Sequence, residues 1–234
     1  MASVVEKKIP HVVVKDHRID TAQKKRDHMR IKILAATTRV FSRIDGDMPV
    51  IEDVVREANI SRGTFYNYFT SLDAALIAAG IDANNRMISD IGPVYEFLME
   101  PWQRASVGFR LFMVRAWQDP KWAAFVTRME TWPHEALLAN NMHKDLSRGK
   151  ELGQFHFDDV TVAIDFVMGA SAGVVQKVRN GVDNPHEYMD SAVRMVLQSL
   201  GCTPELRDLA VAFSRNHISD WVSGERAAWR PVSD

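Results

Sequence analysis

The twenty residues Val50–Phe69, VIEDVVREANISRGTFYNYF, restrict the fold of this chain more than any other segment. Ile51, Val54, Val55 and Ala58 recur at the i, i+3, i+4, i+7 spacing that places apolar side chains on one face of a helix. The segment therefore begins with a short amphipathic helix, whose apolar face must pack against another element.

A tight turn and a second short helix follow this first helix. Asn59 belongs to the residue type that, after glycine, best tolerates the left-handed conformation that ends a helix. Ser61 supplies a side-chain oxygen that caps the free N–H groups of the next helix. Ile60, Phe65 and Phe69 can pack inward together, so the spacing predicts a helix-turn-helix.

The outward face of the second helix is polar, which suits DNA better than a protein core. Gly63 destabilises a helix by roughly 1 kcal/mol relative to alanine, yet it lets a phosphate or a base edge approach the backbone. The second helix of a helix-turn-helix enters the major groove of DNA, so we interpret it as a recognition helix. A helical hairpin inside an all-α core is the alternative, and the exposed polar side chains argue against it.

The decapeptide Ile60–Phe69, ISRGTFYNYF, resembles the recognition helix of TetR-type transcriptional regulators. The family pattern is a small apolar residue, serine, a variable residue, Gly-Thr-aromatic-Tyr and then phenylalanine. The resemblance extends from about Arg26 to about Gly80 and is looser in the rest of the chain. It implies a DNA-binding unit joined to a larger helical body that dimerises and binds a small molecule.

The resemblance implies contacts with double-stranded DNA for the polar groups around this helix. Arg62 would reach a guanine edge or a phosphate, and Asn67 an adenine edge or a phosphate. Residues 1–46 carry six more basic than acidic side chains, which would attract the phosphate backbone. The expected DNA-binding residues are Lys24, Lys25, Arg26, Ser61, Arg62, Gly63, Thr64, Tyr66, Asn67 and Tyr68.

Two positions depart from the family pattern. Val50 stands where the family often has a threonine that contacts phosphate, and Leu72 stands where it often has a lysine. Each change removes a possible phosphate contact and should flatten the salt dependence of DNA binding. A helical module for protein interaction or ligand sensing that has lost DNA binding is therefore the competing interpretation.

Helix-breaking residues divide the chain into an all-α fold of about ten helices. We expect a flexible arm over residues 1–22, a DNA-binding domain over 23–80, and a ligand-binding and dimerisation domain over 81–234. The first helix should run from about Lys24 to Arg43, and the fourth from near Ser71 to about Ile91, before Gly92-Pro93. The remaining helices are expected over residues 102–118, 121–131, 134–148, 158–180, 186–200 and 205–223.

Aromatic side chains are concentrated in three consecutive helices of the body. At this density they can line a cavity for an apolar or aromatic effector, although each residue taken singly is more typical of a core. Asn141 is a further polar candidate. The expected ligand-binding residues are Trp102, Phe109, Phe112, Trp117, Phe125, Trp132, Asn140, His143 and Gln176.

The resemblance also implies a homodimer. Residues 146–155 are similar to the loop that precedes the last two core helices of the family, and those two helices pair with their copies in a second subunit. Small residues within 169–173 would allow close approach there, or equally close packing within one subunit. The expected interface residues are Gly169, Ala172, Gly173, Val193, Val196 and Leu197.

The sequence argues against an enzyme, a cofactor, a metal site and a membrane protein. We find no nucleophile with partners, no catalytic residues, no glycine-rich phosphate loop and no histidine pair with metal-ligand spacing. Cys202 is the only cysteine and fits a reducing cytoplasm. We expect no run of apolar residues that is long enough to span a bilayer. We therefore expect a cytoplasmic protein.

Overall fold

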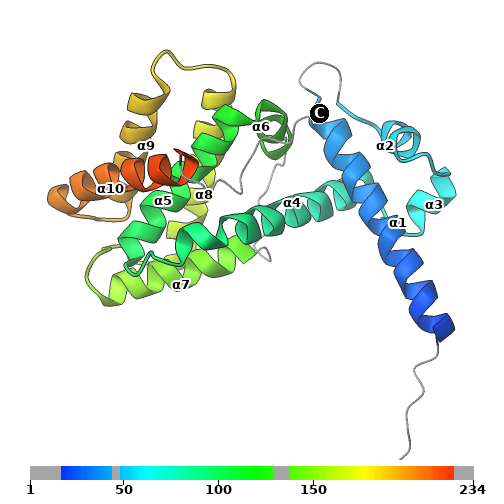
Figure 1. Cartoon of the computed structure of the whole chain (residues 1–234), viewed down its shortest axis with the longest axis horizontal. Coiled ribbons are helices and arrows are strands. Elements are labelled where there is room, and N and C mark those ends of the chain that lie inside the picture. Colours follow the sequence, from blue (N-terminus) through cyan, green and yellow to red (C-terminus); the bar gives the residue numbers. More distant parts are fainter. Residues whose placement is uncertain (1–16, 44–47, 129–136, 224–234) are drawn as a thin grey trace, which may run out of the picture.

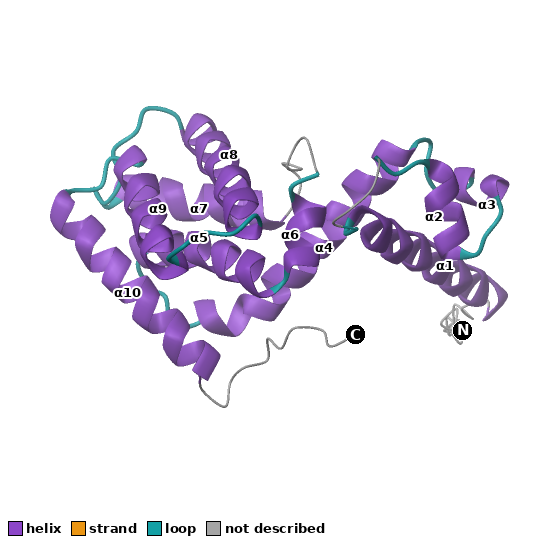
Figure 2. Cartoon of the chain, turned by 90° about the horizontal axis from the view of Figure 1, so that it is seen from above, coloured by secondary structure: helices purple, strands orange, loops and turns teal. Residues whose placement is uncertain are grey.

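The computed structural model describes residues 17–43, 48–128 and 137–223, which form ten α-helices and no strand. A small group of helices and a larger group lie at opposite ends of the molecule (Figures 1 and 2). The predicted all-α fold is confirmed. The small group holds α1 (His17–Phe41), α2 (Ile51–Ala58) and α3 (Arg62–Tyr66), while α4 (Leu72–Tyr95) runs from this group into the larger one.

The core of the small group comes from the apolar stripe of α1. Ile33, Val40 and Phe41 are buried there together with Val54 of α2 and Phe65 of α3. α1 packs against both α2 and α4, so one long helix supports the two short ones. The apolar side chains of α1 therefore form one inward stripe.

The first helix begins at His17, seven residues before the expected start at Lys24. Residues 21–28 are exposed on every side, so no apolar stripe marks this part of α1 in the sequence. The amide of Gln23 donates to the carboxylate of Asp27 one turn later, at 2.9 Å. The helix therefore extends into the segment expected to be a flexible arm.

The fourth helix continues through Gly92-Pro93, where we expected it to stop, and ends at Tyr95. A proline removes one backbone hydrogen bond from a helix and crowds the preceding turn. Here Val94 and Leu98 are buried, and this burial holds the last turn in place. The expected start is confirmed, because the Ser71 hydroxyl accepts the Ala74 N–H at 3.0 Å.

The larger group is built around α5, which packs against every later helix. Pro101 and Pro120 occupy the first turns of α5 and α6, so these helices begin one residue before the expected starts at 102 and 121. The helices of this group are α5 (Pro101–Gln118), α6 (Pro120–Val126), α7 (Leu137–Glu151), α8 (Val160–Arg179), α9 (Pro185–Ser199) and α10 (Pro204–Ser223).

Most of the segment 146–155, which we expected to be a loop, belongs to the end of α7. Gly149 lies inside this helix against the ring of Phe155, which folds back over it. A Cβ atom at Gly149 would lie 2.2 Å from Cδ2 of that ring, so the close approach requires glycine. The glycine therefore serves packing and does not break the helix.

The expectation that no apolar run is long enough to cross a bilayer is corrected by α8. Val160–Arg179 is long enough, and with a mean hydropathy of 1.2 apolar enough, to cross a membrane by length and composition. The helix nevertheless packs against α5, α6, α7 and α9, as a core helix of a bundle does. Its apolar composition is explained by these contacts and by the exposed apolar face described below.

Candidate functional site

The turn between α2 and α3 has the geometry that the sequence predicts. Asn59 adopts a left-handed conformation with φ of 46°, and its N–H donates to the Arg56 carbonyl at 3.1 Å. The next N–H, of Ile60, donates to the Val55 carbonyl at 3.2 Å. These bonds satisfy the carbonyls at the end of α2 and fix the direction in which the chain enters α3.

Ser61 is the N-cap of α3, as predicted. Its hydroxyl accepts the Thr64 N–H at 3.0 Å and lies 2.8 Å from the Thr64 hydroxyl. Thr64 is half-buried, so its methyl group and hydroxyl are partly occupied in stabilising the helix. This pair fixes the start of the recognition helix before any DNA is bound.

The outward face of α3 is open to solvent. Arg62, Tyr66 and Asn67 are exposed, whereas Phe65 on the opposite side is completely buried. Tyr68 is half-buried and packs against the core. The exposed basic residues 24–26 lie on α1 at the same end of the molecule (Figure 1). The expected DNA-binding residues thus share one end of the molecule, with Ser61 and Gly63 also exposed.

Glu52 is a residue of this surface that the sequence analysis missed. Its carboxylate lies 2.9 Å from Nη1 of Arg62, although both side chains are more than half exposed. The Arg62 guanidinium also lies 5.9 Å from the centre of the Tyr66 ring. A hydrogen bond with Tyr66, and then the charge of Glu52, raise the pKa of Arg62 above its ordinary value. Only the packing of α3 on α2 brings Glu52 and Arg62 together.

The two departures from the family pattern lie at helix starts. Val50 precedes α2 and is half-exposed, and its N–H donates to the Asp53 carboxylate at 3.0 Å. Leu72 is the first residue of α4 and packs partly against the core. Neither side chain offers a hydrogen-bond donor to a phosphate.

A cavity of about 250 Å³ lies inside the larger group. Its walls come from α4, α5, α7 and α8, and Val196 of α9 and Leu200, the residue after α9, close one side. Phe109 and Phe112 contribute two aromatic walls, and most of the lining is apolar. The volume and the lining suit a small ligand with an apolar or aromatic body.

One side of the cavity carries an ion pair between α5 and α7. Nε of Arg104 donates to the Asp145 carboxylate at 2.8 Å. Burial raises the pKa of Asp145 above its ordinary value, and its hydrogen bond with Arg104 opposes this shift. The Arg104 guanidinium lies 5.0 Å from the centre of the Tyr95 ring. These groups give the cavity one polar wall with both hydrogen-bond donors and acceptors.

Tyr95 and Gly108 complete this polar wall. A Cβ atom at Gly108 would lie 2.3 Å from the Tyr95 hydroxyl, so glycine leaves room for that group. Burial, and then the charge of Asp145, raise the pKa of Tyr95, so its phenol stays protonated and neutral. Asn141 lines the cavity one helical turn before Asp145.

The structure divides the predicted ligand-binding residues into separate environments. Phe109 and Phe112 line the cavity, whereas Phe125 is fully buried elsewhere in the core and Trp102 packs against Phe213. Trp117 lines a different cleft, and Trp132 lies outside the described residues. The remaining three, Asn140, His143 and Gln176, are exposed.

The predicted interface residues also fall into two sets. Gly169 and Gly173 of α8 are exposed and Ala172 is half-buried, whereas Val193, Val196 and Leu197 of α9 are buried inside the subunit. Buried side chains cannot contact a second subunit directly. The large apolar side chains that these two helices expose are instead Val162, Phe166 and Met195.

The single cysteine is placed for packing. Cys202 is buried, and this burial raises the pKa of its thiol to about 11. The thiol therefore stays protonated near neutral pH, which disfavours nucleophilic chemistry. In the described residues, no group of three or more His, Cys, Asp or Glu side chains could hold a metal ion.

Models of two protein families match this sequence. Residues 33–79 match the bacterial regulatory proteins of the tetR family, and residues 101–210 match the tetracyclin repressor-like C-terminal domain. The first match spans α2, α3 and parts of α1 and α4, and the second spans α5 to α9 with the start of α10. No curated protein matches the sequence.

Solved structures share the fold at low sequence identity. RolR in complex with resorcinol is 23% identical, has a TM-score of 0.65, and aligns over 80% of this chain and 95% of its own. TylP, a TetR regulator from Streptomyces fradiae, is 16% identical with a TM-score of 0.58 over 88% of this chain and all of its own. FadR from Bacillus halodurans is 17% identical, has a TM-score of 0.57, and aligns over 74% of this chain and 97% of its own. The helix-turn-helix, the helical body and both family matches agree, and the chain belongs to the TetR family of DNA-binding transcriptional regulators.

Proposed function

We propose that the protein is a cytoplasmic, homodimeric repressor that binds a near-palindromic DNA operator through α3 of each subunit. The observation that carries this proposal is the exposed polar face of α3, which Asn59 and Ser61 hold in a fixed orientation. A pair of recognition helices on one face of DNA would cover a promoter and block the polymerase.

The exposed apolar face of α8 and α9 supports a dimer. Val162, Phe166 and Met195 are each more than half exposed in the single chain. Gly169 and Gly173 lie on α8 with no atom within 4 Å of a Cβ position, so another helix can approach the backbone closely there. Burying these side chains against a second copy would remove apolar surface from water.

Selection of bound sequences from random DNA tests the operator. We expect a palindromic site whose half-sites lie about 34 Å apart, because two-fold dimers place their recognition helices one helical turn apart. Sedimentation of the same preparation should give the mass of a dimer. A strictly monomeric protein that binds an operator tightly would contradict the proposal.

The same selection from random DNA distinguishes the proposed repressor from the competing function, a ligand-sensing or protein-interaction module that does not bind DNA. Val50 and Leu72 favour that alternative, because neither can donate a hydrogen bond to a phosphate. The exposed Arg62 and the basic residues 24–26 favour DNA binding. Enrichment of no sequence at all would support the alternative.

We infer further that the effector is a small aromatic molecule carrying hydroxyl groups, and that it releases the protein from DNA. The cavity of about 250 Å³ offers Phe109 and Phe112 to an aromatic ring. Asp145 can accept a hydrogen bond from a ligand hydroxyl, and Arg104 can donate one to its oxygen. The complex of RolR with resorcinol, a dihydroxybenzene, is consistent with this class.

Replacing Asp145 with asparagine should weaken resorcinol binding about 10-fold to 100-fold, because a hydrogen bond to a charged group contributes about 1.5–3 kcal/mol. Titration calorimetry with resorcinol as the probe measures the change. Glu151→Gln is the matched control, since Glu151 lies on the same helix but is exposed to solvent. Equal resorcinol affinity in wild type and Asp145→Asn would remove Asp145 from the ligand site.

A further inference from the structure

A second hollow, a cleft of about 680 Å³, opens between α5, α9 and α10. It shares no lining residue with the cavity described above. One end holds Arg110, Asp190 and Arg215, and the rest of the lining mixes polar side chains with apolar ones. The DNA-binding function and the effector cavity make no use of this cleft.

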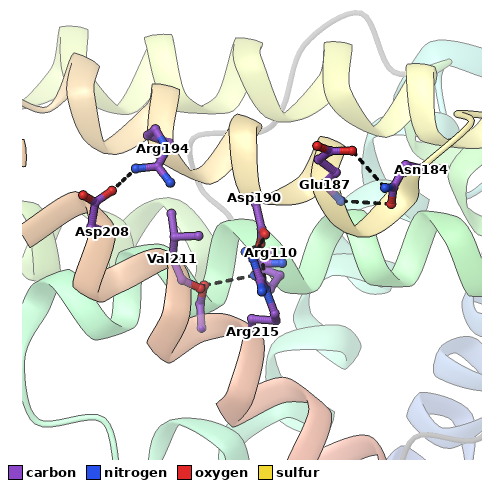
Figure 3. A network of polar contacts seen from close by, with 9 residues as sticks. Arg110, Asn184, Glu187, Asp190, Arg194, Asp208, Val211 and Arg215 are labelled. Atoms are coloured by element: carbon purple, nitrogen blue, oxygen red, sulfur yellow. Dashed lines mark hydrogen bonds and ion pairs between the residues drawn. The ribbon is translucent and has the colours of Figure 1, made fainter.

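Arg110 lies at the buried end of the cleft with only 3% of its side chain exposed. Its Nη2 donates to the Asp190 carboxylate at 2.5 Å, and its Nε donates to the Ser214 hydroxyl at 3.0 Å (Figure 3). Burial, and then the charge of Arg215, lower the pKa of Arg110 to about 10. The guanidinium is therefore still charged at neutral pH, although it is almost completely removed from water.

Arg215 pairs with the same carboxylate from the other side of the cleft. Its guanidinium contacts both oxygens of Asp190, so two cations share one anion (Figure 3). Glu187 also lines the cleft, but its carboxylate accepts a hydrogen bond from Asn184 at 2.9 Å and is directed away from the two arginines (Figure 3). Arg110, Arg215 and Asp190 together carry one net positive charge, on the side of Arg215 that is open to solvent, and a bound anion would balance it.

Part of the cleft wall is apolar and includes an aromatic ring. Val114, Met189 and Ile218 line this part, together with Trp117, which is 47% exposed. The Trp117 ring meets the ring of His186 edge to face, with 5.5 Å between their centres. An exposed indole near one buried and one half-exposed arginine suits a ligand with a charged end and a flat or aliphatic body.

We propose that this cleft binds a small organic acid, whose carboxylate lies beside Arg110 and Arg215 and whose apolar body lies along Trp117. Guanidinium groups bind carboxylates through paired, charge-assisted hydrogen bonds, which gives both affinity and orientation. Arg215 is 54% exposed, so it can turn from Asp190 towards a ligand without leaving solvent. The neutral amide of the same acid lacks the charge that this site selects.

Titration calorimetry with benzoate, phenylacetate and octanoate tests the proposal, with the three corresponding amides as neutral counterparts. At least one acid should bind, and its amide should bind at least 10-fold more weakly. Arg215→Gln should weaken binding of that acid at least 10-fold. Arg194→Gln is the matched control, because Arg194 pairs with Asp208 between the same two helices but outside the cleft (Figure 3).

Arg194→Gln should leave acid binding unchanged. Each variant loses one ion pair between α9 and α10, and thermal unfolding of both variants measures any accompanying loss of stability. Three outcomes would overturn the proposal: no binding of any of the three acids, equal binding of an acid and its amide, or unchanged binding in Arg215→Gln. The last outcome would place the acid elsewhere, for example beside Arg104.

Discussion

Replacing Arg62 with alanine is expected to weaken operator binding by about 1–3 kcal/mol per half-site, and to relax the sequence preference at one position of each half-site. The side chain is 63% exposed at the start of α3, where a guanidinium can reach a guanine edge. Selection from random DNA with wild type and Arg62→Ala measures both effects. A uniform loss over all sequences would mean that Arg62 contacts only phosphate.

Two variants sharpen this test. Arg86→Ala is the matched control, because Arg86 is also 63% exposed and paired with a carboxylate, but lies on α4 outside the helix-turn-helix. Glu52→Gln should act in the opposite direction to Arg62→Ala, because it frees the guanidinium and removes a negative charge that faces DNA. A loss of affinity in Glu52→Gln would indicate that Glu52 contacts a base directly.

Replacing Phe65 with alanine is expected to destabilise the helix-turn-helix by about 3–5 kcal/mol, as for other fully buried phenylalanines. The ring is completely buried, and its centre lies 6.0 Å from the centre of the Phe69 ring. DNA binding should be lost, because α3 no longer has a fixed position. Resorcinol binding should persist, because the effector cavity lies among α4, α5, α7 and α8.

Hydrogen exchange shows which helices lose stability in Phe65→Ala. The amides of α2 and α3 should lose protection in Phe65→Ala, while those of α5 and α8 keep it. Phe97→Ala is the control, because Phe97 is 62% exposed and surface substitutions usually change stability by less than about 0.5 kcal/mol. Equal protection of α3 in wild type and Phe65→Ala would show that this ring does not hold the recognition helix.

The helix-turn-helix could be predicted from the sequence because its determinants are local. Asn59 ends one helix and Ser61 begins the next, and each acts on backbone groups within five residues. The start of α1 and the last residue of α4 were predicted less well. Residues 21–28 of α1 are exposed and carry no apolar stripe, and burial of Val94 keeps α4 helical past a proline.

The cavity could not be predicted in the same way because its polar wall joins distant segments. Arg104 and Asp145 are 41 residues apart, and only the packing of α5 on α7 brings them together. Rotation along a helix is about 100° per residue, so Asn141 lines the cavity while its neighbour Asn140 faces solvent. The face that a helix turns inward depends on its neighbours, which also explains why Val193 is buried and Met195 is exposed.

The two ends of the molecule are joined by one continuous rod, α4. Its first half packs on α1, and its last two turns, with Ile91 and Tyr95, line the cavity. Its 24 residues make a lever about 36 Å long, at 1.5 Å per residue. A tilt of about 5° at the cavity end swings the far end through roughly 3 Å, close to the 3.4 Å rise of one base step. An effector that tilted α4 by this amount would therefore move the recognition helix by about one base step along DNA.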